Sequence, residues 1–145
     1  CRGDNAANNK SLLLKIQENG HSIGNHTYHH IDAYDNAASI FAEDVEKANL
    51  VLNSPLFRPP HGSLNFAAWI KVRKKYKIIY WSLNSADSDM SKFDYDHSIE
   101  NLKCNTKPGD IVLFHFCHRH EKETRQLLPE YLEWLHAQGY VSKAI

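Results

Sequence analysis

The chain has 145 residues, and its 17 basic and 17 acidic residues leave a formal net charge of zero. This length supports one domain with a real hydrophobic core, so we expect residues 1–145 to form a single domain. The balanced charge argues against an electrostatic nucleic-acid binder, and no apolar run reaches the ~18 residues that a membrane span needs. No feature predicts a protein partner.

Strands and helices are expected to alternate along the chain, with breaks at glycine and proline. This alternation predicts an α/β fold with parallel strands. The near-continuous apolar run at 111–115 is typical of a parallel strand covered on both faces. In chain order we expect a helix at 8–19, a strand at 21–24, a helix at 38–53, a strand at 56–58, a helix at 66–76, a strand at 78–82, a polar loop at 83–92, a helix at 94–103, a strand at 111–115, a helix at 124–138 and a strand at 140–145.

Four of the ten histidines lie within residues 20–30, after a predicted helix and a short strand. His26 and His30 are four residues apart, so on a helical turn their rings would point the same way. Neutral imidazole is a common ligand of divalent metals. Ten histidines in a chain of this length also produce such pairs by chance, but the setting of a loop presented by a scaffold favours a metal site.

The stretch Gly-His-Ser-Ile-Gly-Asn-His-Thr-Tyr-His-His resembles the metal motif of the NodB-homology polysaccharide deacetylases, carbohydrate esterase family four. In that family the two histidines four apart bind the metal, and they match His26 and His30. The residue after the first ligand matches Thr27, whereas His29 stands where the family often has serine. The resemblance implies one divalent metal, with zinc expected before cobalt, nickel or manganese.

Further motifs of the same family follow in order. Arg58-Pro-Pro-His-Gly resembles its Arg-Pro-Pro-Tyr-Gly motif, in which the arginine holds the catalytic aspartate and the residue matching His61 supplies a backbone N–H to the oxyanion. The stretch from Trp81 to Asp87 resembles a tryptophan-bearing strand followed by an aspartate that pairs with this arginine. Asp89 is the alternative to Asp87. From the residues alone, Arg58 could also form a structural salt bridge and Asp87 a turn or helix cap.

Leu113-Phe-His115 resembles the family's Leu-x-His motif, in which the leucine lines the acetyl pocket and the histidine is the general acid. A histidine suits this role because its unperturbed pKa lies near neutrality. The alternative is a satisfied core histidine. Trp81 is expected to contact substrate, and His118 and His120 are expected to lie in a surface loop, with adventitious metal binding as the other interpretation.

These features follow predicted strands, as in barrel enzymes with sites at the carboxyl ends of strands. The resemblance implies a distorted (β/α) barrel of the polysaccharide deacetylase type. It also implies that the family's Thr-Phe-Asp-Asp segment, which carries the base and a third ligand, is missing here. We therefore expect a partial catalytic domain with little activity alone.

The function implied is metal-dependent removal of N-acetyl groups from an N-acetylated glycan, either peptidoglycan or a chitin-like polymer, in the cell envelope or outside the cell. The alternative is a non-catalytic glycan-binding relative. A metallo-β-lactamase-like hydrolase would need His-x-His-x-Asp-His, which is absent.

The chain has three cysteines, Cys1, Cys104 and Cys117, and no Cys-x-x-Cys spacing. An odd number of cysteines favours buried or free thiols over a Cys104–Cys117 disulfide.

Overall fold

The computed structural model describes residues 1–88 and 93–145. They divide into two compact units, Cys1–Tyr80 with Ala144–Ile145, and Trp81–Lys143, which are considered in turn. No helix among these residues is long and apolar enough to cross a bilayer.

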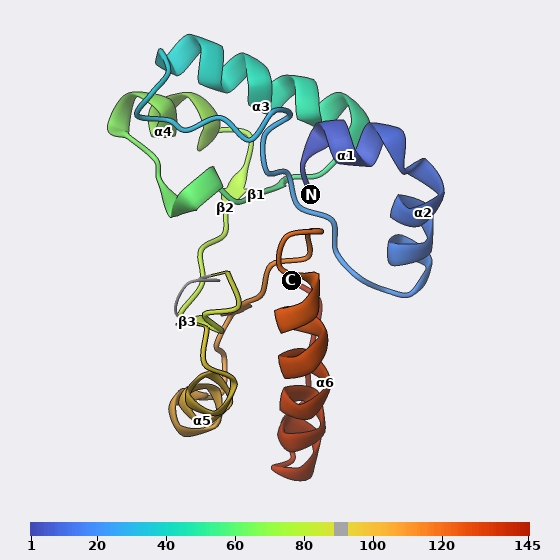
Figure 1. The fold of residues 1–145 in the computed structure, drawn as a ribbon. Helices are drawn as coiled ribbons and strands as arrows, with labels where there is room; N and C mark the ends of the chain where they lie inside the picture. Colours follow the sequence, from blue (N-terminus) through green and yellow to red (C-terminus); the bar gives the residue numbers. More distant parts are fainter. Residues whose placement is uncertain (89–92) are drawn as a thin grey trace. The chain divides into compact units, whose positions relative to one another are not determined.

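The first unit combines helices with one pair of parallel strands (Figure 1). Strands β1 and β2 pair in register, with Phe57 opposite Ile78, and Asn25 forms an isolated parallel bridge to Phe57. This arrangement places the residues after Asn25 and after Phe57 at the same end of the ladder. The elements are α1 (Gly3–Asn8), α2 (Lys10–Glu18), α3 (Ala38–Leu52), β1 (Leu56–Phe57), the 3-10 turn η1 (Pro60–Gly62), α4 (Phe66–Val72) and β2 (Lys77–Ile78).

The core of this unit lies where α3 and α4 pack over the strand pair. Phe41 and Val45 of α3 repeat at helical spacing and are fully buried with Phe57 of β1. Val72 and Tyr76, at the end of α4 and just after it, complete the same cluster. This amphipathic pattern explains why the predicted helix at 38–53 is confirmed almost to the residue.

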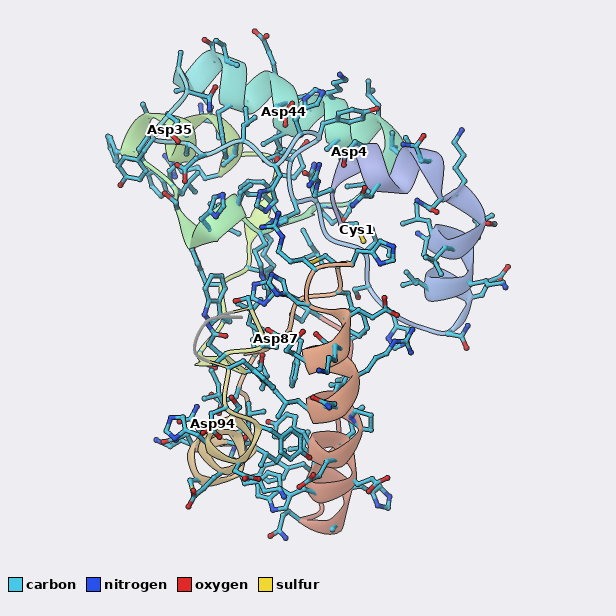
Figure 2. All side chains as sticks on the ribbon, in the orientation of Figure 1. Cys1, Asp4, Asp35, Asp44, Asp87 and Asp94 are labelled. Carbon is cyan, nitrogen blue, oxygen red and sulfur yellow. The ribbon has the colours of Figure 1, made fainter. Side chains whose placement is uncertain are left out.

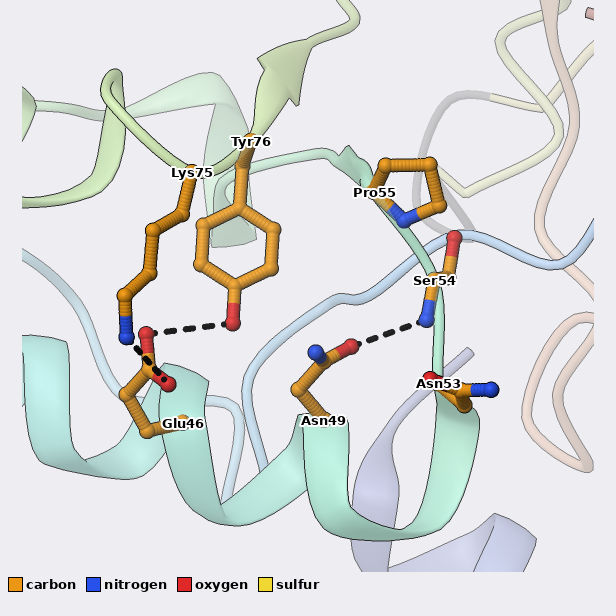
Figure 3. A pocket seen from close by; sticks show the side chains of 7 residues that line it. All are labelled: Glu46, Asn49, Asn53, Ser54, Pro55, Lys75 and Tyr76. Atoms are coloured by element: carbon orange, nitrogen blue, oxygen red, sulfur yellow. Dashed lines mark hydrogen bonds and ion pairs between the residues drawn. The ribbon is translucent and has the colours of Figure 1, made fainter.

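Polar side chains of α3 hold the chain segments that lead into the strands (Figure 3). Glu46 accepts a hydrogen bond from the Tyr76 hydroxyl at 3.2 Å and pairs with Lys75 at 3.0 Å. Asn49 Oδ1 accepts from the backbone N–H of Ser54 at 2.9 Å, just before β1. These contacts line a surface pocket and anchor the starts of both strands to one helix.

The second unit is a smaller α/β arrangement. Strands β3 (Leu83–Asn84) and β4 (Val112–Leu113) run parallel, and helices α5 (Tyr95–Asn105) and α6 (Glu121–Ala137) pack against each other. Their contact buries four apolar side chains, Ile99, Leu102, Leu127 and Tyr131. Parallel strand pairs alternating with helices in both units confirm the predicted α/β class.

Several predicted elements are corrected. The helix expected at 8–19 is two helices, because Asn9, with φ −132° and ψ 47°, interrupts the helical path. No strand forms at 21–24 or 140–145, where the backbone makes no ladder. The strand expected at 78–82 is divided, because Ile79 donates to the Phe57 carbonyl whereas Ser82 donates to that of Ile111.

As a result, Leu83 and Asn84, expected in a polar loop, form β3. The strand expected at 111–115 narrows to Val112–Leu113. Residues 89–92 of the predicted polar loop lie outside the described residues. The alternative acid, Asp89, is one of them. Cys1, Cys104 and Cys117 are all free thiols, so the disulfide alternative is wrong.

Candidate active site

The histidine loop brings two imidazoles together without forming a helical turn. Residues 26–30 have no helical structure, and Thr27 and His30 adopt left-handed backbone angles with φ of 61° and 62°. Such angles are uncommon outside glycine and mark a loop held by its surroundings. The rings of His26 and His30 meet edge to face with centroids 4.9 Å apart. The predicted proximity of the rings is therefore present, although its helical explanation was wrong.

Both histidines are neutral near pH 7. Burial, the positive charge of the N-terminal amine, His30 and Arg58 lower the pKa of His26 to about 4. Burial is the main cause that lowers the pKa of His30, and the nearby His61 is a smaller one. Neutral imidazole is the form that binds metals. The electrostatic setting therefore suits both residues for ligation.

The tautomer of His26 is set by the backbone. Its Nδ1 lies 2.6 Å from the carbonyl oxygen of Arg58, and because a carbonyl only accepts, Nδ1 must carry the proton. The lone pair is then on Nε2. Metal-binding histidines in proteins commonly donate their other ring N–H to a carbonyl in this way. The Thr27 hydroxyl oxygen, between the two histidines in sequence, is buried without a hydrogen-bond partner in the described part of the chain.

His61 lies beside the pair. It follows Pro59 and Pro60, has φ 57°, and its ring centroid is 4.8 Å from that of His30. The sequence predicted His61 as a substrate-binding residue whose backbone N–H serves the oxyanion, and it did not predict this ring contact. Among residues 1–88 and 93–145, no group of three His, Cys, Asp or Glu side chains is arranged to hold a metal. A divalent cation at this site would therefore have two protein ligands from the described residues, His26 and His30.

Arg58 is fixed at the carboxyl end of β1. Its backbone N–H donates to the Asn25 carbonyl at 2.9 Å, which joins it to the start of the histidine loop. Its side chain donates to the carbonyls of Ile79 and Tyr80 at 3.2 and 3.4 Å. Burial lowers the pKa of its guanidinium. The guanidinium of Arg58, which two prolines follow, is thus anchored just beyond the end of the neighbouring strand.

In the second unit, the buried carboxylate of Asp87 is hydrogen-bonded to His115. Asp87 is fully buried, and its carboxylate accepts hydrogen bonds from the ring Nδ1 and the backbone N–H of His115, both at 2.7 Å. The Thr124 hydroxyl donates to the same carboxylate at 2.7 Å. Figure 2 labels Asp87 on the segment that follows β3. Three donors thus fix the carboxylate, and the carboxylate in turn orients the imidazole through Nδ1.

Burial alone would raise the pKa of Asp87, but hydrogen bonds from His115, Thr124 and Ser85 outweigh it and lower the pKa to about 2. An ionised Asp87 keeps the proton of His115 on Nδ1, so Nε2 is the nitrogen left for proton transfer. The His115 side chain is 35% exposed, which allows a reactant to reach it. A carboxylate that orients an imidazole is a common arrangement for general acid–base chemistry.

The structure shows a partner of Asp87, His115, that the sequence did not predict. Sequence reasoning paired Asp87 with Arg58 and did not foresee its contact with His115 or the role of Thr124. Arg58 belongs to the first unit and Asp87 to the second, so their ion pair stays a prediction. Nothing in the sequence around Asp87 indicates that Thr124, 37 residues later and on α6, would donate a hydrogen bond to it.

The remaining predicted residues lie near this pair in the chain. Leu113 is buried on β4, two residues before His115, and Trp81 is partly buried just before β3. His118 is exposed, as expected of a surface loop. His120 is instead partly buried, with its ring 5.9 Å from that of His115, and its Nδ1 has no partner among the described residues.

Comparison with known proteins places these features in a family. Polysaccharide deacetylase is the family that matches residues 1–81. The chain is 29% identical over 138 residues to a peptidoglycan-N-acetylglucosamine deacetylase of Bacillus cereus, covering 91% of this chain and 65% of that protein. It is 28% identical over 149 residues to a peptidoglycan-N-acetylmuramic acid deacetylase of Bacillus subtilis, covering 92% and 53%. The chain thus spans between half and two thirds of the length of these relatives.

Among solved structures, a family 4 carbohydrate esterase from Streptomyces lividans in complex with acetate superposes with a TM-score of 0.85 at 21% identity. The superposition covers 97% of this chain and 74% of that chain, and it confirms the predicted fold of the polysaccharide deacetylase type. Family membership also suggests a divalent metal. With more than half of its residues matched, the chain belongs to the polysaccharide deacetylase family, the NodB-homology group of carbohydrate esterase family four.

Proposed function

We propose that the protein hydrolyses the N-acetyl amide of an N-acetylated glycan, with peptidoglycan first and a chitin-like polymer second. The observation that carries this proposal is the pair of neutral imidazoles, His26 and His30, in a chain of this family. Two relatives are named for deacetylation of peptidoglycan and a third for deacetylation of chitooligosaccharides. Action on peptidoglycan would place the protein in the cell envelope or outside the cell.

His26 and His30 would hold a divalent cation, for which zinc is the first choice and cobalt, nickel and manganese are alternatives. Imidazole nitrogen is a good ligand for each of these metals. When bound, such a cation supplies Lewis-acid polarisation of a carbonyl oxygen and lowers the pKa of water. The tautomer of His26, fixed by the Arg58 carbonyl, and the lowered pKa values of both histidines support this assignment.

The remaining roles are assigned to residues of this chain. Water would add to the acetyl carbonyl carbon and give a proton to the base that the family carries in its Thr-Phe-Asp-Asp segment. His115 would then donate a proton from Nε2 to the departing sugar amine as the C–N bond breaks, which releases acetate and the free amine. Asp87 would hold the His115 ring in place and stabilise its protonated form. The backbone N–H of His61 would donate to the developing oxyanion. Arg58 would orient the catalytic aspartate through its charge. Leu113 would line the acetyl position, and Trp81 would contact the sugar.

The test is acetate release from N-acetylglucosamine oligomers and from peptidoglycan by a form of the protein that carries the family's Thr-Phe-Asp-Asp segment ahead of residue 1, after chelation and again after zinc is returned. The 145-residue chain alone should release little acetate, because it would lack the base. We expect zinc-dependent release that His115→Ala lowers by roughly 10²–10⁴-fold, the usual contribution of a positioned acid. His118→Ala, which removes an exposed histidine of the same segment, is the matched control and should act like the parent. Glycan binding without any acetate release would instead favour the non-catalytic glycan-binding alternative.

A further inference from the structure

Asp44 is a buried carboxylate that the proposed chemistry does not use. It lies on α3 and is 8% exposed, and Figure 2 labels it there. One oxygen, Oδ2, accepts hydrogen bonds from the backbone N–H groups of Tyr28 and His29 at 2.8 and 2.9 Å. The other oxygen, Oδ1, lies 2.5 Å from His29 Nδ1. All three contacts fall on the residues between the two predicted metal ligands.

The same segment makes further hydrogen bonds to α3 and α1. The side chain of Asn25 accepts from the Thr27 N–H and donates to the Val45 carbonyl on α3, both at 2.9 Å. The N–H groups of Gly3 and Asp4, in α1, donate to the carbonyls of Thr27 and Tyr28 at 2.9 and 3.2 Å. Backbone groups of the loop are thus hydrogen-bonded to two helices.

Asp44 has a distinct place among these contacts. Thr27 and His30 keep left-handed backbone angles, which persist only where neighbouring groups determine the conformation. Between them, the Tyr28 and His29 N–H groups point to a single acceptor oxygen, Asp44 Oδ2. Removing that acceptor would leave two backbone donors in a partly buried setting without their partner, which favours rearrangement of the loop.

We propose that Asp44 is a positioning residue that holds His26 and His30 at the separation that one metal ion requires. It touches neither the substrate nor the metal and acts through the backbone of Tyr28 and His29. The inference rests on the proposed function, because it takes the two histidines as ligands. Groups that orient metal ligands in this way typically change metal affinity by 10–100-fold when they are removed.

The first experiment measures zinc affinity of the 145-residue chain by isothermal titration calorimetry. Asp44→Asn keeps the shape of the side chain and loses its charge and one acceptor, and we expect it to weaken zinc binding by about 10–100-fold. Glu43→Gln, an exposed neighbour on α3, is the matched control and should stay within twofold of the parent. His30→Ala should abolish binding. If Asp44→Asn binds zinc like the parent while His30→Ala does not, the positioning role is wrong.

The second experiment needs no metal. Amide hydrogen exchange of Tyr28 and His29 should be at least tenfold faster in Asp44→Asn and in Asp44→Ala, and unchanged in Glu43→Gln. Unchanged protection in both Asp44 variants would overturn the inference. Failure of the parent chain to bind zinc would instead contradict the proposed function, with the exchange rates still deciding whether Asp44 holds the loop. A purely structural role would lower thermal stability and leave the zinc affinity of the folded variant unchanged.

Discussion

At the scale of single residues, the site depends on buried charges that are fully hydrogen-bonded. Asp87 has no exposure and three donors on its carboxylate, two of them from His115. A buried carboxylate is tolerated only when its acceptors are satisfied. The same hydrogen bonds that keep Asp87 ionised also hold the His115 ring in one orientation. Their loss would therefore lower both the stability of the fold and the activity proposed for His115.

Replacing Asp87 tests this arrangement directly. Asp87→Ala leaves the ring and backbone N–H groups of His115 without their acceptor, while the Thr124 hydroxyl keeps the carbonyls of His115 and His120. We expect a loss of roughly 2–4 kcal/mol in unfolding free energy. Urea denaturation measures the change. Glu100→Ala removes an exposed carboxylate from α5 and serves as the control, for which we expect a change within about 0.5 kcal/mol. Equal values for the two variants would contradict the buried pair.

The lowered pKa of Asp87 also predicts a pH dependence of stability. The folded pKa is about 2, whereas an unfolded aspartate titrates near a pKa of about 3.9. The resulting stabilisation is present above about pH 4 and is lost as the pH falls towards 2, because only the unfolded chain binds the proton in that interval. The full amount is about 2–3 kcal/mol for this group.

Urea titrations at pH 5 and pH 2.5 compare the parent with Asp87→Asn. The variant should lose about 2 kcal/mol less than the parent between these two conditions, since the amide does not titrate. Identical losses would show that Asp87 does not contribute to the acid sensitivity of the fold.

At the scale of elements, the close approach of α1 to the histidine loop depends on one glycine. A Cβ atom on Gly3 would lie 2.6 Å from the Tyr28 ring and 2.9 Å from the Cα of Ala48 on α3. The second neighbour is backbone and cannot move without shifting the helix. The absence of a side chain at Gly3 therefore lets α1 donate its first N–H groups to the loop.

We expect Gly3→Ala to lower the unfolding free energy by about 1–3 kcal/mol, the usual cost of overpacking a tight contact. The control is Gly24→Ala, whose added Cβ would meet only Leu56 at an ordinary 3.7 Å. Thermal unfolding measures both variants. A Gly3→Ala protein as stable as the control would show that α1 can withdraw from the loop without cost.

At the scale of the whole molecule, a metal held by His26 and His30 would link binding to folding. A ligand that binds only the native state adds about 2.7 kcal/mol when its concentration is 100 times its dissociation constant. We therefore expect the melting temperature of the chelated protein to rise with zinc concentration. The double variant His26→Ala, His30→Ala should show no rise, whereas His118→Ala should respond like the parent. A rise of equal size in the double variant would place the zinc elsewhere.

Sequence alone identified the side chains that carry the proposed chemistry and the class of fold. His26, His30, Arg58, Asp87 and His115 are recognisable because each lies beside residues whose order is specific to one family. Helix α3 was also predictable, since Phe41, Val45 and Ala48 repeat at helical spacing and are all buried. Local periodicity determines such a helix whatever it packs against.

Tertiary structure decided which of these groups meet. The rings of His26 and His30 come together through left-handed angles at Thr27 and His30, which distant donors and acceptors in α1 and α3 hold. The bond from Thr124 to Asp87 joins residues 37 positions apart. The strand expected at 78–82 was divided because its backbone donors found different acceptors, in β1 and before β4. Hydrogen-bond partners remote in sequence set these features, and no local pattern encodes them.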